Sequence, residues 1–169
     1  RDEWGLGDFP FYFVQLAPNG SLGQGNGTSQ AFLREAQLRT MLSVENTGMA
    51  VTLDIGSTIT NHPPEKLLIG KRLAYWALAK NYGFNGLPHS GPVYESMKVK
   101  NNKVYVNFKF AKNGVTSYGK PLSGFEIAGE DKIFYSADAL IDPHWSAGWE
   151  NRSVLTLSNK NVPNPLYIR

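Results

Sequence analysis

The feature that most constrains the fold is a change in hydrophobic pattern near residue 83. Before it, short apolar runs that read as strands, residues 11–16 and 49–55, alternate with segments of helical period, residues 29–42 and 64–80. Strand and helix in such short alternating units favour a parallel sheet with helices packed against it. The continuous apolar run at residues 11–16 is typical of a strand covered on both faces.

The predicted helices carry signals at their ends. Ser29 can cap the first helix through its hydroxyl. Pro64 suits the first turn of the second helix, where Glu65 would complement the positive end of the helix dipole. Lys80 and Gly83 then mark the end of that helix.

After residue 83 the pattern becomes that of an antiparallel structure. Residues 86–92 are rich in glycine and proline and read as a linker. Residues 104–110 alternate between apolar and polar, which indicates a half-buried strand. Asn101-Asn102, just before this strand, is a plausible two-residue hairpin turn.

Further short strands follow along the second half. Residues 125–135 read as a hairpin around Gly129, and residues 153–157 and 165–168 supply more strands. Many short strands with closely spaced turn signals predict an antiparallel sandwich. We therefore expect two domains, residues 1–85 and residues 86–169.

Composition removes several classes of function. Of 169 residues, 41% are hydrophobic and 18% are charged, which is too apolar for a disordered chain. No stretch approaches the roughly 20 apolar residues of a membrane span. Lys+Arg 17 against Asp+Glu 14 gives +3 without a run of like charges, so nucleic acid is not an expected partner. With no cysteine and with scattered histidines (His62, His89, His144), no metal site is expected.

The segment 54–63 is where we expect chemistry. In open parallel sheets, ligands bind beyond the carboxyl ends of the strands. His62 is predicted there, just before the second helix, whose N-terminus disfavours an imidazolium ion. A neutral imidazole can accept the proton of a serine nucleophile. From position alone, His62 could instead cap the helix or bond within a loop.

Asp54, at the end of the second predicted strand, is the candidate to orient His62 or to brace the loop. His89 in the linker and His144 in a later loop read as surface or packing residues. Several aromatic side chains could stack on sugar faces, although packing is the commoner use of aromatics in a sandwich. They are Tyr94, Tyr118, Trp145 and Trp149.

Blocks spread from about Phe9 to Arg169 carry a likeness to a known family. They are residues 10–16, 33–37, 47–51, 54–56, 62–63 with Lys66, 70–74, 90–94 and 124–131. Taken together, and in this order, they resemble the sialate O-acetylesterase family. Its members are carbohydrate esterases of the SGNH type, which remove O-acetyl groups from sialic acids or related sugars with a serine nucleophile and a histidine base.

The resemblance implies a fold and a role for one residue. Residues 1–85 would be the C-terminal βα units of a flavodoxin-like SGNH hydrolase sheet, and residues 86–169 an incomplete antiparallel β-sandwich. His62 would be the catalytic histidine, acting on an acetylated sugar without a metal or organic cofactor. Such esterases usually act outside the cytoplasm, so a periplasmic, secreted or lysosomal location is expected.

The chain departs from the family in two places. The family's serine lies in a Gly-Gln-Ser-Asn block well before this region, and Gly23-Gln24-Gly25-Asn26 lacks the serine. An acidic residue usually stands just before the histidine, where this chain has Thr60-Asn61. Asp54 is the available substitute for that carboxylate.

These departures predict a part of a longer protein. The chain begins at Arg1 without a signal-peptide pattern and ends within a predicted strand. We expect the remainder of the polypeptide to supply the serine, and the chain alone to be inactive on esters. The alternative is a non-catalytic carbohydrate-binding or scaffold module.

Overall fold

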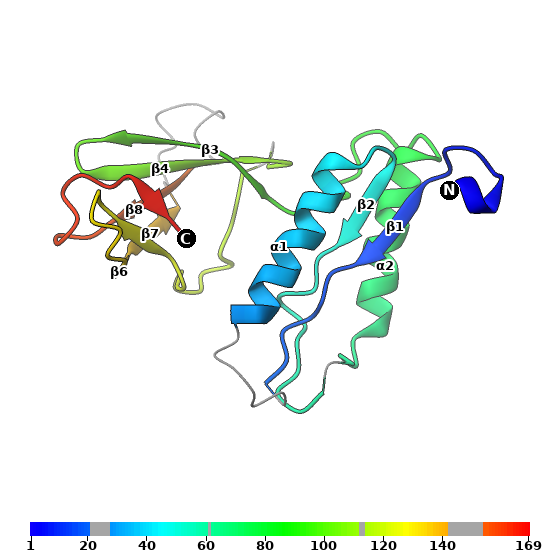
Figure 1. Ribbon diagram of the computed structural model, residues 1–169, viewed down its shortest axis with the longest axis horizontal. Helices are drawn as coiled ribbons and strands as arrows, with labels where there is room; N and C mark the ends of the chain where they lie inside the picture. The colour runs from blue at the N-terminus through cyan, green and yellow to red at the C-terminus, as the bar shows by residue number, and fades with distance from the viewer. Residues whose placement is uncertain (21–27, 61, 112–113, 142–153) are drawn as a thin grey trace. The chain divides into compact units, whose positions relative to one another are not determined.

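The computed structural model describes residues 1–20, 28–60, 62–111, 114–141 and 154–169 (Figure 1). The chain divides into two compact units, Arg1–Gly91 and Pro92–Arg169. The division falls within the glycine- and proline-rich stretch at residues 86–92. Within its described residues, the protein is a mixed α/β structure with two α-helices, one parallel sheet and two antiparallel sheets.

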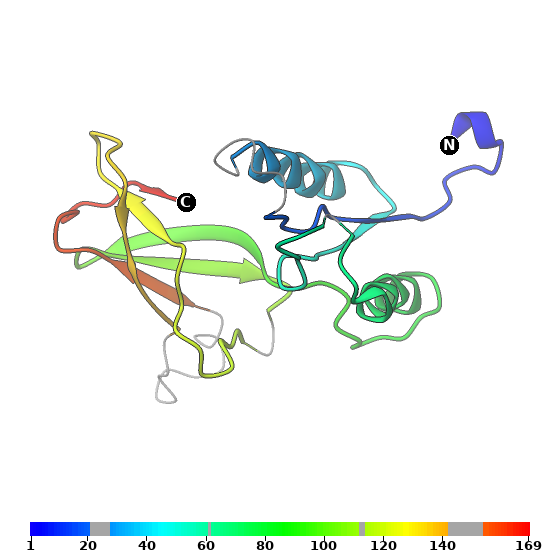
Figure 2. The same cartoon turned by 90° about the horizontal axis from the view of Figure 1, so that it is seen from below.

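The first unit is built on two parallel strands. Strand β1 (Phe11–Val14) pairs with β2 (Thr47–Ala50), and Phe11 lies opposite Thr47. Helix α1 (Thr28–Ser43) and helix α2 (Lys66–Lys80) lie on opposite faces of these strands, as Figure 2 shows. The predicted order of strand, helix, strand and helix, with parallel pairing, is confirmed.

Both strands of this unit end earlier than the apolar pattern predicts. The predicted runs 11–16 and 49–55 shorten to β1 and β2, because the Thr52 hydroxyl donates to the Gln15 carbonyl at 2.7 Å. A side-chain hydrogen bond thus takes the place of the next main-chain hydrogen bond between the two strands. The prediction that the first strand is covered on both faces is wrong for its ends, since Phe11 is 55% and Val14 38% exposed.

The helix starts also differ from prediction. Helix α1 includes Thr28, so Ser29 is not at its N-cap position. Pro64 precedes α2 instead of forming its first turn, because the Lys66 N–H donates to the Pro64 carbonyl at 2.7 Å and closes a turn. Glu65 is the N-cap residue, without a side-chain capping bond.

The predicted end of α2 at Lys80 is confirmed. The N–H of the C-cap residue Asn81 donates to the Ala77 carbonyl at 2.8 Å. Gly83 follows with a φ of 72°, a left-handed conformation that glycine adopts without strain.

Trp76 fastens α2 to the sheet. Its side chain is 4% exposed, and its Nε1–H donates to the Met49 carbonyl at 3.0 Å. The indole lies directly over Gly48: a Cβ there would be 2.5 Å from the Trp76 ring and 2.8 Å from the Tyr12 ring. The absence of a side chain at residue 48 therefore allows the helix to approach this closely.

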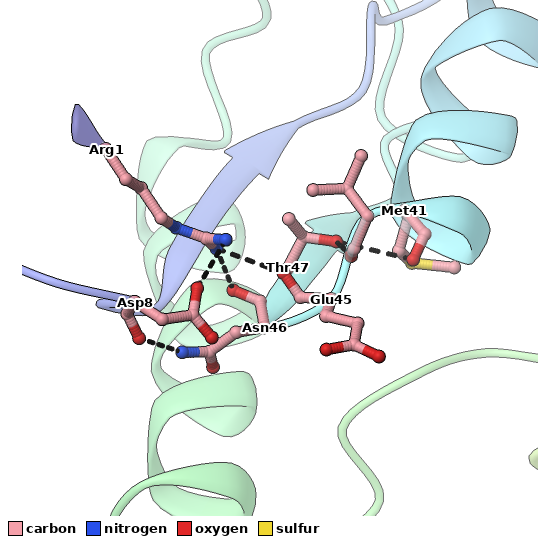
Figure 3. A network of polar contacts seen from close by, with 7 residues as sticks. Arg1, Asp8, Met41, Glu45, Asn46 and Thr47 are labelled. Carbon is pink, nitrogen blue, oxygen red and sulfur yellow. Dashed lines mark hydrogen bonds and ion pairs between the residues drawn. The ribbon is translucent and has the colours of Figure 1, made fainter.

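The N-terminal segment is bound to the turn that precedes β2 (Figure 3). The Arg1 guanidinium pairs with the Asp8 carboxylate at 2.5 Å and donates to the Glu45 and Asn46 carbonyls at 3.0 and 2.9 Å. The Asn46 amide donates in turn to the Asp8 carbonyl at 2.6 Å. These bonds fix the approach of the chain to β1.

The second unit contains two antiparallel sheets. One has the order β3 (Val93–Lys100), β4 (Lys103–Lys109), β8 (Leu155–Ser158) and β7 (Asp138–Ile141). The other has the order β6 (Tyr135–Ser136), β5 (Glu126–Ala128) and β9 (Tyr167–Ile168). One apolar core draws on both sheets: Val104, Val106, Ile127, Leu155, Leu157 and Val162.

The predicted hairpins of this unit are present. Asn101 and Asn102 have φ angles of 50° and 60° and join Lys100 to its partner Lys103. Two consecutive left-handed residues are the signature of the turn type that matches strand twist. Strand β5 pairs with β6, although β6 begins only at Tyr135. Neither helix in the described residues is long and apolar enough to cross a membrane.

Candidate functional site

His62 lies on the connection between β2 and α2. It is exposed, and its main-chain N–H donates to the Thr60 hydroxyl at 3.1 Å. Because α2 begins at Lys66 rather than at Pro64, His62 is separated from the helix by a turn. His62 thus lies on the loop, three residues before the N-cap residue Glu65.

Asp54 is held by helix α2. Its two carboxylate oxygens accept from Arg72 Nη1 and Nη2 at 2.7 and 2.6 Å, and Nη1 also donates to the Val51 carbonyl at 2.6 Å. The hydrogen bond from Arg72 lowers the pKa of Asp54 below its usual value, and the same bond raises the pKa of Arg72. These are the contacts of a brace, one of the two roles expected for Asp54.

The loop that carries His62 is also joined to the segment after β1. The Ser57 N–H donates to the Pro18 carbonyl and the Gly20 N–H to the Ser57 carbonyl, each at 3.1 Å. A Cβ on Gly56 would be 2.4 Å from the Pro18 carbonyl oxygen, so only glycine permits this crossing. The two segments thus run side by side beyond the carboxyl ends of the strands.

A cavity of about 440 Å³ lies at the same end of the strands. It borders Pro63, the residue after His62, and Gln15, whose side chain is 6% exposed. The remaining lining residues are Val14, Leu16, Ala17, Leu33, Gln37, Thr52, Lys66 and Ile69. The walls are thus mainly apolar, with a few amide, hydroxyl and ammonium groups.

The other candidate residues fall into two groups. His89 is half-buried and packs edge-on against Trp76 at 4.6 Å, and burial lowers the pKa of His89. Of the two roles predicted for His89, surface or packing, the structure shows packing. Tyr94 and Tyr118, in contrast, are 52% and 87% exposed. The predictions for the remaining residues lie outside the described part of the chain. These residues are Asn61, His144, Trp145, Trp149 and the segment 23–26.

Two residues of this region were not predicted from the sequence to have a role. Arg72 stands within the helical pattern of α2, and only the position of its guanidinium in space reveals its contact with Asp54. Gln15 had a signal, because it is the polar residue in the apolar run 11–16. Within the described ranges, no cluster of three or more histidine, aspartate or glutamate side chains is arranged to hold a metal ion.

No protein-family model matches the chain, and neither does any curated protein sequence. Among solved structures, the chain is similar to XAC1771, a carbohydrate acetylesterase from Xanthomonas citri, with 32% identity and a TM-score of 0.79. The match covers 95% of this chain and 35% of that chain. The protein described here thus spans about a third of the length of the esterase it matches.

Proposed function

We propose that this chain is the histidine-bearing part of a carbohydrate esterase. It would remove O-acetyl groups from sialic acid or related sugars by serine–histidine acyl transfer, in a compartment outside the cytoplasm. The observation that carries the proposal is the match of 95% of the chain to a carbohydrate acetylesterase. The exposed His62, on the loop after β2, supplies a base that a substrate and a nucleophile can reach.

In this proposal the two units are the last βα units of a flavodoxin-like SGNH sheet and a β-sandwich portion. The serine comes from the remainder of the polypeptide. The 35% coverage of the matched esterase leaves ample chain length for it.

The proposed reaction proceeds by two acyl transfers. The serine oxygen attacks the acetyl carbonyl while its proton passes to the His62 imidazole. The C–O bond to the sugar then breaks, and His62 returns the proton to the leaving sugar hydroxyl. Water attacks the acetyl-serine with the same base, releasing acetate and restoring the serine hydroxyl.

Asp54 acts in this scheme as a positioning residue. Arg72 pairs with Asp54 and also donates to the Val51 carbonyl. These two contacts join the start of the loop after β2 to helix α2. Because both Asp54 oxygens bond the Arg72 guanidinium, the proposal takes the direct carboxylate partner of His62 to be a group from elsewhere in the polypeptide.

Substitution of His62 tests the proposal in the longer polypeptide. We expect His62→Ala to lower kcat for acetate release from an O-acetylated sialic acid by on the order of 10³-fold or more, because the base is lost. Ile59→Ala is the matched control: Ile59 is on the same loop, is 81% exposed and should leave kcat unchanged. Equal activity of His62→Ala and the parent protein would exclude His62 as the base.

A non-catalytic carbohydrate-binding role is the second candidate, favoured by the exposure of Tyr94 and Tyr118. Exposed aromatic rings are suited to stacking on sugar faces. Titration calorimetry with an unacetylated sugar separates the esterase from the binding module. If the chain is a binding module, Tyr118→Ala weakens sugar binding and His62→Ala has no effect on function.

A further inference from the structure

The second unit contains a hollow that the proposed reaction does not use. Its volume is about 340 Å³, and every residue that lines it belongs to the unit Pro92–Arg169. Two connections form it: residues 129–135, which run from the end of β5 into β6, and residues 161–166, between β8 and β9. Ligand pockets in proteins commonly measure about 300–1,000 Å³. The hollow is therefore large enough for one small ligand or for one residue of a polymer.

Hydrogen bonds hold both connections in place. The Ile133 N–H donates to Asp131 Oδ1 at 3.0 Å, which closes the turn after β5. The Leu166 N–H donates to the Ala128 carbonyl at 2.8 Å, which joins the second connection to the end of β5. A site whose walls are fixed before binding loses less conformational entropy when a ligand enters. The hollow is therefore formed in the protein without a ligand.

Four polar side chains line the hollow. Glu130 and Asp131 come from the first connection, and Asn161 and Asn164 come from the second. The two connections meet at Gly129, where a Cβ would be 3.5 Å from the Asn164 carbonyl oxygen and 3.8 Å from Asp131 Oδ1. Carboxylates only accept hydrogen bonds, whereas carboxamides both donate and accept. Neighbouring hydroxyl groups of one ligand, each able to donate and to accept, match this set of partners.

An apolar surface lies beside these polar groups. Val162 is 3% exposed and belongs to the core of the unit, and the half-buried Tyr135 packs against that core. Leu166, also in the lining, is 50% exposed. An aromatic ring with apolar neighbours suits the C–H face of a sugar ring, whose hydroxyl groups project from its edge. Polar and apolar walls together therefore fit a sugar.

The charge of the lining selects among sugars. Among the described residues that line the hollow, Glu130 and Asp131 are negatively charged and none is positively charged. Lys132 does not line it, and its Nζ lies 5.6 Å from the centre of the Tyr167 ring. Like charges brought close together repel each other. The hollow therefore disfavours a sugar that carries a carboxylate, as sialic acids do, and favours a neutral one.

We propose that this hollow binds a neutral hexose residue of the carbohydrate chain that carries the acetyl ester. The two carboxylates accept hydrogen bonds from sugar hydroxyls, the two carboxamides donate to them, and the sugar ring lies against Tyr135. This inference rests on the proposed function, because the bound chain is that of the esterase substrate. It adds a sugar site in the unit that does not carry His62, built from residues other than Tyr94 and Tyr118.

Amide NMR of the 169-residue chain, titrated with unacetylated sugars, tests the proposal. Cellotetraose and lactose are neutral, whereas N-acetylneuraminic acid carries a carboxylate. We expect at least one of the neutral sugars to shift the resonances of residues 129–135 and 161–166, and the acid to leave them unchanged. The absence of shifts with both neutral sugars, or an equally strong response to the acid, would overturn the proposal.

Glu130→Ala and Asp138→Ala are a matched pair of variants. Both residues are exposed carboxylates of the second unit, and only Glu130 lines the hollow. Glu130→Ala should raise the Kd of the neutral sugar by about tenfold, because a hydrogen bond to a charged group is lost. Asp138→Ala should leave the Kd unchanged. Equal Kd values for the two variants would contradict the proposed site.

Calcium chloride alone provides the remaining test, because carboxylate and carboxamide oxygens also bind this cation. We expect it to leave the Tm of the chain unchanged. A rise in Tm that Glu130→Ala abolishes would overturn the proposal, since the hollow would then be a cation site. The sugars in these titrations carry no ester, so the result does not depend on whether His62→Ala lowers kcat, and the two proposals fail separately.

Discussion

Arg72 determines how the loop after β2 leaves the sheet. Its guanidinium binds the Val51 carbonyl and both oxygens of Asp54, so it joins α2 to the start of the loop that carries His62. The sequence predicted Asp54 as a strand-end residue that could act on His62 or on the loop. The contact between Asp54 and Arg72 could not be predicted, because Arg72 is in the following helix and the contact depends on how α2 packs on β2.

The Asp54–Arg72 pair predicts a dependence of stability on pH. The hydrogen bond from Arg72 holds the folded-state pKa of Asp54 below the usual carboxyl value of 3.8, so the stabilisation is complete above that value and is lost as pH falls through the lowered pKa. Asp54 is 59% exposed, so solvent screening keeps the contribution below about 1 kcal/mol.

Asp54→Asn should therefore reduce the free energy of unfolding at pH 7, and the difference from the parent chain should shrink as the pH falls below the usual carboxyl pKa of 3.8. Urea unfolding at pH 7 and at a series of acidic pH values measures it. A difference of the same size at every pH would show that the charge of Asp54 is irrelevant to stability.

Gly48 leads to a second prediction at this scale. A methyl group there would overlap the Trp76 and Tyr12 rings, so Gly48→Ala should lower the free energy of unfolding by about 1–3 kcal/mol. Gly70→Ala is the control, because Gly70 is in α2 with open space around it and should gain about 0.5–1 kcal/mol. Urea unfolding followed by tryptophan fluorescence compares them, and equal effects would exclude steric overlap as the cause.

At the scale of elements, the hydrophobic period predicted the type and order of the strands and helices, and their ends less well. Periodicity reports which side chains are buried, and the ends are decided by single hydrogen bonds. The Thr52 hydroxyl ends the β1–β2 ladder early, and the bond from the Lys66 N–H to the Pro64 carbonyl delays α2. In the second unit, the Asn101-Asn102 turn was predictable because its residues tolerate positive φ.

That turn provides the prediction for elements. Asn102→Ala should lower the Tm, since a left-handed alanine costs about 1–2 kcal/mol, whereas Asn102→Gly should keep or raise the Tm. Thermal unfolding monitored by circular dichroism distinguishes them. Equal Tm values for both variants would mean that the hairpin adopts another turn.

At the scale of the whole molecule, the sequence predicted two parts with different architectures and placed His62 between the second strand and the second helix. It could not predict the cavity at the carboxyl ends of the strands. The cavity lies where Gln15, Gln37 and Pro63 come together in space, and the spacing of these residues along the chain carries no signal for it.

The chain by itself should turn over p-nitrophenyl acetate no faster than free imidazole at the same concentration. The proposed mechanism needs a serine from the remainder of the polypeptide, and without it an exposed imidazole gives only the background reaction of this activated ester. The release of p-nitrophenol, followed with the chain and with its His62→Ala variant, measures this. A serine-type turnover that His62→Ala abolishes would show that the nucleophile is within these 169 residues.

The crossing of Gly56 over Pro18 limits how this protein can be redesigned. The backbones at Gly56 and Pro18 are too close for a methyl group between them and are joined by main-chain hydrogen bonds. The loop that carries His62 therefore cannot be lengthened or redirected unless the segment at Pro18 changes with it. A change in the position of the imidazole therefore requires coordinated substitutions near residues 18–20 and 56–58, two stretches that are distant in the chain. Variant libraries confined to either stretch should yield mainly unfolded or unaltered proteins.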